Sequence, residues 1–290
     1  MTRSAAIAHV TDTAFWVGAL RANETKRTDG VFHDPLAALV AGTRGEKIAR
    51  AMPDTALVQW GVVVRTSAID RLIGEALNKG VDTVVNLGAG LDTRPYRMTL
   101  PPQTRWIEID FPSMVRWKDE VLAGQKAVCS LERIGLDLSD RAARSDVFKV
   151  LGSTSGKTLL IAEGVMPYLS NEAVADLAKE LAGIPTFCYW ILDFDNAGPR
   201  RTPKSWAKQL EGAPFLFQPG DWFKFFAGCG WQPRTVISSA EESDKLNKPY
   251  PFVFPQGLLM RVLPREVRRR ILSVSGAALL TKNVAPTARP

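Results

Sequence analysis

The stretch VVNLGAGLDTRPYR, residues 84–97, joins a short apolar run to a pair of glycines. A β-branched run of this length favours a buried strand. Gly88 and Gly90 follow it, and glycines at this point allow a tight turn and a close approach of a ligand to the backbone. Thr93 takes the place of the third glycine of the dinucleotide-binding fingerprint. The stretch therefore predicts a strand and a ligand-binding turn that differs from that of nicotinamide enzymes.

Four further short apolar runs show the same pattern, and they alternate with helix-like segments. The predicted strands are 83–87, 105–109, 131–136, 158–162 and 187–192. Short buried strands that alternate with helices form a parallel sheet with crossover helices, so the fold class is α/β. The strands end at Gly88, Asp110, Asp137, Glu163 and Asp193. Because ligands bind outside the carboxyl ends of such strands, we expect these residues to face one crevice.

The segments around this core have distinct compositions. Residues 1–80 are expected to form an N-terminal helical cap packed on a core of residues 81–263. Residues 194–230 are too long for a plain loop and are predicted to be a lid insertion whose helices cover the crevice. Two last strands, 231–237 and 258–263, are expected to pair antiparallel. Residues 264–290 are expected to form a basic C-terminal helix and tail.

The charge of the chain is concentrated near its end. The 290 residues carry a formal charge of +7. Residues 261–290 contain seven basic residues and one acid, which is +6, so the first 260 residues carry only +1. A broad nucleic-acid-binding surface over the main body is therefore disfavoured.

Cysteine usage and hydropathy indicate the compartment. Cys129, Cys188 and Cys229 are far apart and form neither a zinc pattern nor a disulfide framework, which favours a reducing environment. The first residues lack the apolar run of a signal peptide, and no run of about 18 apolar residues occurs. We expect a cytoplasmic protein without a metal site.

Three motifs in order resemble the leucine carboxyl methyltransferase family, a branch of the class I S-adenosylmethionine-dependent methyltransferases. They are NLGAGLDTR at 86–94, EIDFP at 108–112 and LIAEGV at 160–165. An N-terminal signature fits as well: Arg21-Ala22, Lys26-Arg27-Thr28-Asp29 and His33-Asp34-Pro35. The resemblance covers residues 15–263 and implies a Rossmann-like methyltransferase fold, with a mostly parallel seven-stranded sheet and an antiparallel last strand. It implies S-adenosyl-L-methionine as the cofactor.

The resemblance also implies a cofactor site. Its matching positions are Arg21, Arg65, Gly88, Ala89, Gly90, Asp110, Asp137, Leu138 and Glu163. In this interpretation Arg65 pairs with the cofactor carboxylate and Asp110 binds the ribose. Asp137 and Leu138 flank the adenine, Gly88 passes under the methionine moiety, and Glu163 lies near the amino and sulfonium end. A second cation for the carboxylate could be Arg21, Lys26 or Arg27, and the spacing leaves that choice open.

Each of these residues also has a purely structural interpretation. Arg65 could be a surface arginine paired with Asp70 or Glu75. Asp110 and Asp137 could cap helices, and Glu163 could be an ordinary loop acid.

The histidines and the lid aromatics are less promising. His33 is more typical of a structural residue than of a catalytic one, and His9 is given no role. The aromatic residues of the lid, Trp222, Phe223, Phe225 and Phe226, fit a packed lid core better than a substrate box.

The expected reaction is methyl transfer to an oxygen of a small molecule, such as a polyketide-type metabolite. A carboxylate acceptor is ionised at neutral pH and needs no base, whereas a phenol gains from one. The lack of an evident base favours the carboxylate, and Tyr168 would orient the substrate. The alternatives are a protein C-terminal carboxyl methyltransferase and a nicotinamide-dependent oxidoreductase, and the oligomeric state is left open.

The basic tail is expected to contain an amphipathic helix. Pro264 can start it, and Val267, Ile271, Val274 and Ala278 fall on one face. A basic amphipathic helix can lie on an anionic membrane or dock on a partner. We favour a helix packed on the domain with a solvated basic face over membrane contact, and a disordered segment at 283–290.

Overall fold

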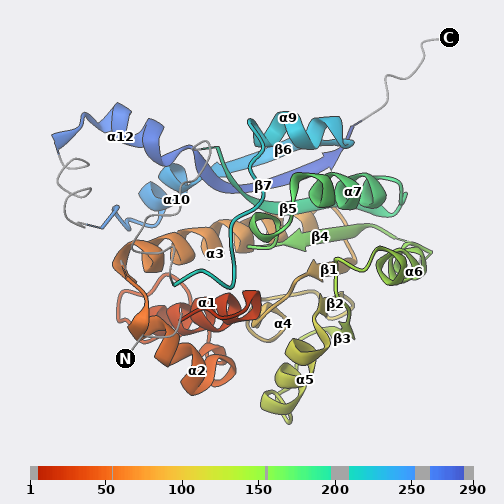
Figure 1. Cartoon of the computed structure of the whole chain (residues 1–290), viewed down its shortest axis with the longest axis horizontal. Coiled ribbons are helices and arrows are strands. Elements are labelled where there is room, and N and C mark those ends of the chain that lie inside the picture. Colours follow the sequence, from red (N-terminus) through yellow and green to blue (C-terminus); the bar gives the residue numbers. More distant parts are fainter. Residues whose placement is uncertain (1–5, 54, 154–155, 197–208, 252–261, 284–290) are drawn as a thin grey trace.

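A seven-stranded sheet forms the centre of the molecule. The computed structural model describes residues 6–53, 55–153, 156–196, 209–251 and 262–283, and its strand order is β3-β2-β1-β4-β5-β7-β6 (Figure 1). The strands are β1 Thr83–Leu87, β2 Arg105–Asp110, β3 Ser130–Gly135, β4 Thr158–Ala162, β5 Phe187–Asp195, β6 Trp231–Ser238 and β7 Ser275–Lys282. The first five strands are parallel and β7 runs antiparallel to both β5 and β6. This confirms the predicted fold class.

Helices cover both faces of the sheet. They are α1 Val10–Thr25, α2 Ala37–Ala51, α3 Thr55–Leu77, α4 Arg94–Arg97, α5 Pro112–Val121, α6 Arg141–Gly152, α7 Asn171–Ala182, α9 Trp222–Gly228, α10 Ser239–Lys245 and α12 Arg265–Leu272, with a 3₁₀ turn η1 at Met166–Tyr168. Side chains of α6, α7 and α9 share one apolar cluster with the sheet, and those of α3 share a second cluster on alternate strand residues. The helices α1, α2 and α5 form a third cluster. None of the described helices is both long and apolar enough to cross a membrane.

The position of β1 fixes where a ligand can bind. β1 lies between β2 and β4, so the chain leaves it in one direction and returns to its other side. Such a reversal in an open α/β sheet opens a crevice at the carboxyl ends of the strands. The helix α1 closes that end of the molecule, because its residues line the crevice there.

The last strand differs from the sequence prediction. Residues 258–261 of the predicted strand 258–263 lie outside the described residues, and Val262 and Leu263 belong to no strand. The strand β7 instead uses residues 275–282, which the sequence suggested as helix and tail. Ala277, Ala278, Leu279 and Leu280 are all buried, because β7 lies between two other strands. Burial on both faces removes the alternation typical of a strand, and Ala and Leu favour helices, so tertiary context overrode local propensity. The core sheet therefore extends beyond 263.

The helix that precedes β7 also corrects a prediction. The helix α12 ends at Leu272, so Val274 and Ala278 are not on its apolar face. None of the residues of α12 is buried in the described structure, and Val267 and Ile271 are 42% and 43% exposed. The apolar side that the sequence predicted is therefore not buried, although α12 contacts α10 and its Arg265 and Arg269 are largely exposed.

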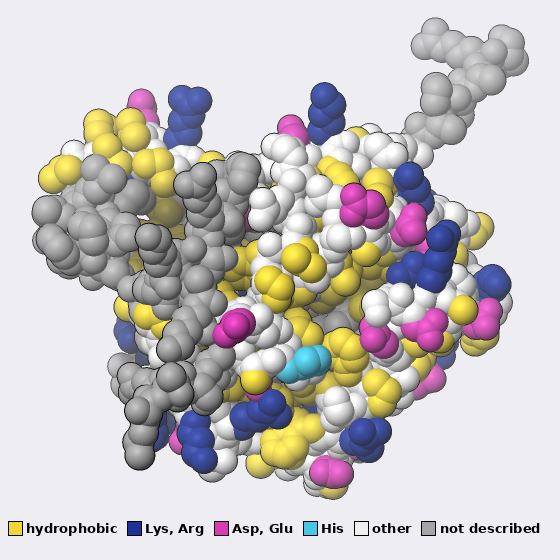
Figure 2. Space-filling model, viewed as in Figure 1, with side chains coloured by type: hydrophobic (Ala, Val, Ile, Leu, Met, Phe, Trp, Pro, Cys, Tyr) yellow, Lys and Arg dark blue, Asp and Glu magenta, His cyan; other side chains and the backbone are white. Residues whose placement is uncertain are grey.

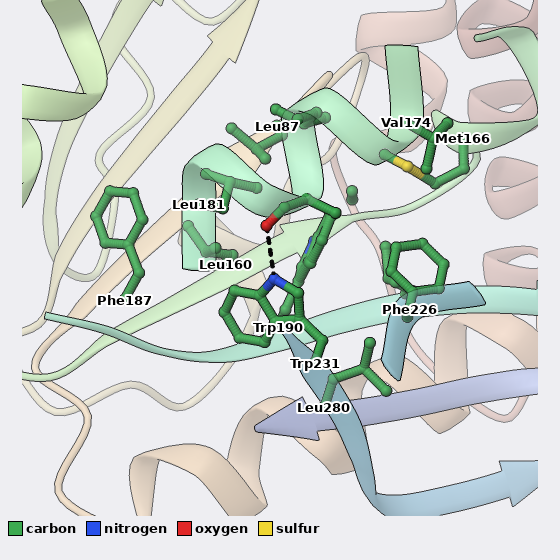
Figure 3. Packing of buried hydrophobic residues seen from close by; sticks show 14 of the residues in the cluster. Leu87, Leu160, Met166, Val174, Leu181, Phe187, Trp190, Phe226, Trp231 and Leu280 are labelled. Carbon is green, nitrogen blue, oxygen red and sulfur yellow. Dashed lines mark hydrogen bonds between the residues drawn. The ribbon is translucent and has the colours of Figure 1, made fainter. Parts of the chain in front are cut away.

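An aromatic core joins the antiparallel end of the sheet to α7 and α9. Trp231 is fully buried, and its indole Nε1 donates a hydrogen bond of 2.9 Å to the carbonyl of Ala178 (Figure 3). The rings of Trp231 and Phe226 each lie 5.4 Å from Trp190. Trp222 is also buried, so Trp222 and Phe226 belong to the core, as predicted for the lid aromatics.

Replacing Trp231 should test this core. Trp231→Phe removes a buried hydrogen bond and leaves a small cavity, so we expect a loss of about 2 kcal/mol in the free energy of unfolding. Trp60→Phe is the matched control, because the half-buried Trp60 also donates from Nε1, to the carbonyl of Lys248. Urea unfolding of both variants measures the difference. An equal decrease in the free energy of unfolding in the two variants would contradict a special contribution from the buried hydrogen bond of Trp231.

Candidate active site

A cavity of about 400 Å³ opens at the carboxyl ends of the parallel strands. Its walls come from α1, α3, the loops after β1–β4 and residues 212–214. It contains all ten candidate residues: Arg21, Arg65, Gly88, Ala89, Gly90, Asp110, Asp137, Leu138, Glu163 and Tyr168. The structure thus brings together every position that the resemblance assigned to the cofactor, together with Tyr168. Asp193, the fifth strand end expected at the crevice, is not part of the lining.

The glycine turn after β1 is required by its backbone. Gly88 has φ +62°, and a Cβ placed there would lie 2.5 Å from Val165 Cγ2. Gly90 has φ +47°, a conformation that L side chains rarely adopt. Any side chain at Gly88 would therefore strain the backbone and push the loop after β4 away from the cavity.

Asp110 holds this turn from the end of β2. Its Oδ2 accepts a hydrogen bond of 2.6 Å from the Gly90 amide, and its Oδ1 accepts one of 2.7 Å from the Phe111 amide. Burial raises the pKa of Asp110, while the two backbone hydrogen bonds act against that rise. Each oxygen keeps a further lone pair, so the carboxylate can accept from a ligand hydroxyl while it fixes the turn.

Glu163 lies between two guanidinium groups. Its Oε1 is 2.9 Å from Arg65 Nε, and its Oε2 is 2.9 Å from an Arg94 terminal nitrogen. Burial alone would raise the pKa of Glu163, but Arg94 and Arg65 lower it below its ordinary value. Glu163 is therefore an acceptor that is ionised at neutral pH and held by two cations, rather than an ordinary solvent-exposed loop acid.

Arg65 joins α3 to the ends of two strands. Besides Glu163, it contacts Asp193 Oδ2 of β5 at 3.3 Å, and Asp193 Oδ1 accepts from the Gly164 amide at 2.8 Å. The surface pairs suggested by the sequence are wrong. Asp70 instead binds Arg94 and Arg97, and Glu75 binds Lys79.

Arg94 and Asp92 are functional candidates that the sequence reasoning did not select. Asp92 lines the cavity, and its Oδ2 is 2.8 Å from a terminal nitrogen of Arg94. Burial alone would raise the pKa of Asp92, but the cations around it, Arg94 first, lower it. Arg94 is only 2% exposed, and it also binds Asp70 at 2.6 Å. Both residues are in the quoted glycine-turn motif, but sequence spacing gave no sign that Arg94 reaches Glu163.

The structure selects one of the three N-terminal cations. Arg21 is 7% exposed and lines the cavity, held by Asp34 Oδ2 at 3.0 Å and by the Leu91 carbonyl. Arg27 instead pairs with Asp29 at the surface, and Lys26 is exposed. Asp34 also accepts from Thr93 Oγ1 at 2.6 Å, so the Asp34 of the N-terminal signature anchors the cavity wall. His33 is exposed and lies outside the lining.

The remaining candidates lie at the two ends of the cavity. Asp137 accepts from the Ser139 amide at 2.8 Å, and the cap of α6 is Asp140, not Asp137. Leu138 lies beside Asp137 in the lining. Tyr168 ends η1, and its ring centroid is 5.7 Å from that of Phe215.

Two irregular segments meet beside the cavity. The Ile7 amide donates to the Gln209 carbonyl at 3.0 Å, and the Gly212 amide donates to the Ile7 carbonyl at 3.3 Å. Within 209–221 the structure has no helix, and α9 packs on the sheet instead of over the crevice. Residues 6–8 and 209–212 thus form an irregular strap beside the cavity. The predicted lid insertion also includes residues 197–208, which lie outside the described residues, so a helical lid stays a prediction.

The comparison with protein families decides the assignment. The model of the leucine carboxyl methyltransferase family matches residues 14–182, more than half of the chain. The chain belongs to this family. It is an S-adenosylmethionine-dependent methyltransferase, and the nicotinamide-dependent alternative is wrong.

Bacterial relatives of the same class cover most of the chain. An inferred S-adenosyl-L-methionine-dependent methyltransferase of Streptomyces coelicolor is 30% identical over 76% of this chain and 82% of the relative. One from Frankia alni is 30% identical over 86% and 92%. One from Mycobacterium bovis is 33% identical over 82% and 85%.

Two solved structures share the fold. A DUF574 family protein from Streptomyces avermitilis has a TM-score of 0.56 at 14% identity, covering 92% of this chain and 97% of that one. A structure described as an inferred methyltransferase from Thermobifida fusca also has a TM-score of 0.56 at 14% identity, covering 96% of both chains.

Removing the charge of Glu163 should destabilise the protein in a pH-dependent way. Glu163→Gln leaves Arg65 and Arg94 without their shared partner, so we expect a loss of about 2–4 kcal/mol at neutral pH. A carboxylate with a lowered folded pKa stabilises the protein above its unfolded pKa, and this stability is lost as the pH falls through the folded pKa. The difference in the free energy of unfolding between wild type and variant should therefore decrease as the pH falls below 4.5, the ordinary pKa of a glutamate.

Urea unfolding across the acid range measures this gap. Glu132→Gln is the control, because Glu132 is 51% exposed and pairs with the exposed Arg105. Its effect should stay below about 0.5 kcal/mol at every pH. A gap for Glu163→Gln that is constant with pH would exclude an ionised Glu163 as the stabilising group.

Proposed function

We propose that the chain transfers a methyl group from S-adenosylmethionine to a carboxylate oxygen of a small, largely apolar molecule. The observation that carries this proposal is the division of the cavity wall. Its six charged groups, Arg21, Arg65, Asp92, Asp110, Asp137 and Glu163, come mostly from the strand ends. Apart from Arg21, the lining residues from α1 and residues 212–214 are neutral.

The charged wall fits the cofactor. Its four carboxylates and two guanidiniums leave a formal excess of two negative charges, which suits a ligand with a sulfonium, an ammonium and one carboxylate. The guanidiniums of Arg21 and Arg65 would receive the carboxylate. Glu163 would receive the ammonium, and Asp110 the ribose hydroxyls. Asp137 and Leu138 would flank the adenine.

The turn itself supplies the space for the cofactor. Gly88, Ala89 and Gly90 line the cavity with backbone, and a side chain at Gly88 would meet Val165. When bound, the cofactor supplies an electrophilic methyl group on its sulfonium. The chain's own residues position the two reactants, and holding them in register accounts for much of the rate enhancement that such a site can give.

The neutral wall fits an apolar acceptor. It presents Val10, Val17 and Ala213, with the hydroxyls of Thr11 and Thr13 among them. Tyr168 and Leu169 continue this wall from the other side. Tyr168 would orient the acceptor. Such a surface would desolvate the body of a small molecule and leave a few hydroxyls for hydrogen bonding.

The protonation states favour a carboxylate acceptor. The described lining contains no histidine, and Asp92 and Glu163 have pKa values lowered by neighbouring cations, which makes them weak bases. Asp110 uses both oxygens to hold backbone amides. A carboxylate needs no deprotonation at neutral pH. A peptide C-terminus is less favoured as the acceptor, because the strap formed by residues 6–8 and 209–212 narrows the approach from that side.

Ligand-induced stabilisation tests the cofactor site. S-adenosylhomocysteine at about one hundred times its Kd should add about 2.7 kcal/mol, a shift of several degrees in Tm. Asp110→Ala should abolish the shift, whereas Asp119→Ala, at an exposed acid that pairs with Arg133 outside the cavity, should keep it. NAD and NADP should give none. A shift that survives in Asp110→Ala would remove Asp110 from the site.

The pH dependence of methyl transfer tests the acceptor. With apolar carboxylic acids, kcat/KM should be nearly flat from about pH 6 to 8.5, because the acceptor is already ionised. With phenols of similar size, the rate should be lower and rise up to about tenfold per pH unit. Transfer of a radiolabelled methyl group measures both. A phenol that outperforms every carboxylic acid at neutral pH would overturn the carboxylate proposal and leave the cofactor assignment intact.

A further inference from the structure

The helix α12 is held to α10 by two of its four arginines, and two of its apolar side chains lie on the opposite side of the helix. Arg269 Nε is 3.5 Å from Asp244 of α10, and a terminal nitrogen of Arg265 is 4.0 Å from the same carboxylate. Val267 and Ile271 are each two positions further along, about 200° around the helix from those arginines. The ion pairs to α10 therefore turn Val267 and Ile271 outward.

This orientation is the reverse of an ordinary amphipathic surface helix, which buries its apolar side. Val267 and Ile271 are 42% and 43% exposed, and Val262 before the helix is 71% exposed. Figure 2 shows hydrophobic side chains gathered at the projecting corner where Figure 1 places α12. Within the described residues, α12 packs chiefly against α10.

Charge flanks the outward side. On the helix, Arg268 and Arg270 follow Val267 and precede Ile271. They border the apolar pair on its two sides, and Arg268 is half-buried whereas Arg270 is exposed. The residues of α12 include four arginines and one glutamate. An apolar strip bordered by arginines is the pattern of a helix that lies in a lipid interface, where long basic side chains reach the head groups.

We propose that α12 docks the protein on an anionic membrane surface, with Val267 and Ile271 entering the interface and the exposed Arg270 contacting lipid phosphates. A second copy of the chain fits this strip less well. A stable protein interface buries about 800 Å² per partner, and a few exposed aliphatic side chains on an eight-residue helix supply far less. Lipid docking needs no complementary protein surface, and each arginine near an anionic leaflet strengthens it. The proposal rests on α12 and is independent of the methyl acceptor.

Vesicle cosedimentation of the full chain tests the docking. Vesicles of phosphatidylcholine with phosphatidylglycerol should bind the protein at low salt, and phosphatidylcholine alone should bind it far less. Val267→Gln with Ile271→Gln should weaken binding about tenfold. Arg270→Gln should weaken it about fivefold, the factor that one arginine near an anionic leaflet contributes.

Two matched controls separate local docking from general attraction by a basic protein. Val150→Gln removes a 68% exposed aliphatic side chain from α6, and Arg141→Gln with Lys149→Gln removes two exposed cations from the same helix. Both should bind like wild type. A Tm shift with S-adenosylhomocysteine in every variant would show that the fold is retained.

Three results would overturn the proposal. One is no binding to the anionic vesicles, and another is equal loss in the α6 controls and the α12 variants. The third is a dimer in analytical ultracentrifugation that disappears in Val267→Gln with Ile271→Gln, because the strip would then serve self-association.

Discussion

The site depends on one buried charge arrangement, the Glu163 carboxylate between Arg65 and Arg94. Glu163 follows β4, Arg65 belongs to α3, and Arg94 follows the glycine turn after β1. One carboxylate thus joins a helix on one face of the sheet to two strand ends. An uncompensated buried charge costs several kcal/mol. The folded state therefore needs Glu163, Arg65 and Arg94 in place at the same time. Asp70, Asp92 and Asp193 supply the remaining partners, so the cation-rich end of the cavity is assembled before any ligand arrives.

Pre-assembled charges have a consequence for recognition. The guanidinium groups of Arg21 and Arg65 already have acidic partners, Asp34 for the first and Glu163 with Asp193 for the second. In the proposed site, a ligand carboxylate would therefore join existing pairs rather than order a flexible side chain, which would lower the entropic cost of binding.

Sequence patterns predicted most of the core and most of the site, for a common physical reason. The parallel strands are short and apolar, and each is followed by a glycine or an acid, so the sequence predicted where the cavity lies. Asp110, Asp137 and Glu163 all line it. What failed depended on contacts between distant residues. The strand β7 is rich in Ala and Leu, and only its place between β5 and β6 makes it a strand. Arg94 and the choice of Arg21 over Lys26 and Arg27 required the fold, because spacing along the chain cannot show which cation a buried carboxylate will meet.

The late position of β7 in the chain sets the order in which the sheet can be completed during synthesis. In the described structure β6 pairs with β7 alone, and β7 is the only partner on the outer side of β5. Until residues 275–282 leave the ribosome, β5 presents an open edge of buried residues such as Trp190 and Ile191. An open apolar edge invites pairing with other chains. The nascent chain therefore stays exposed to such pairing until residues 275–282 are made. A messenger truncated before codon 275 would yield a product whose sheet cannot be completed and which depends on chaperones to stay unaggregated.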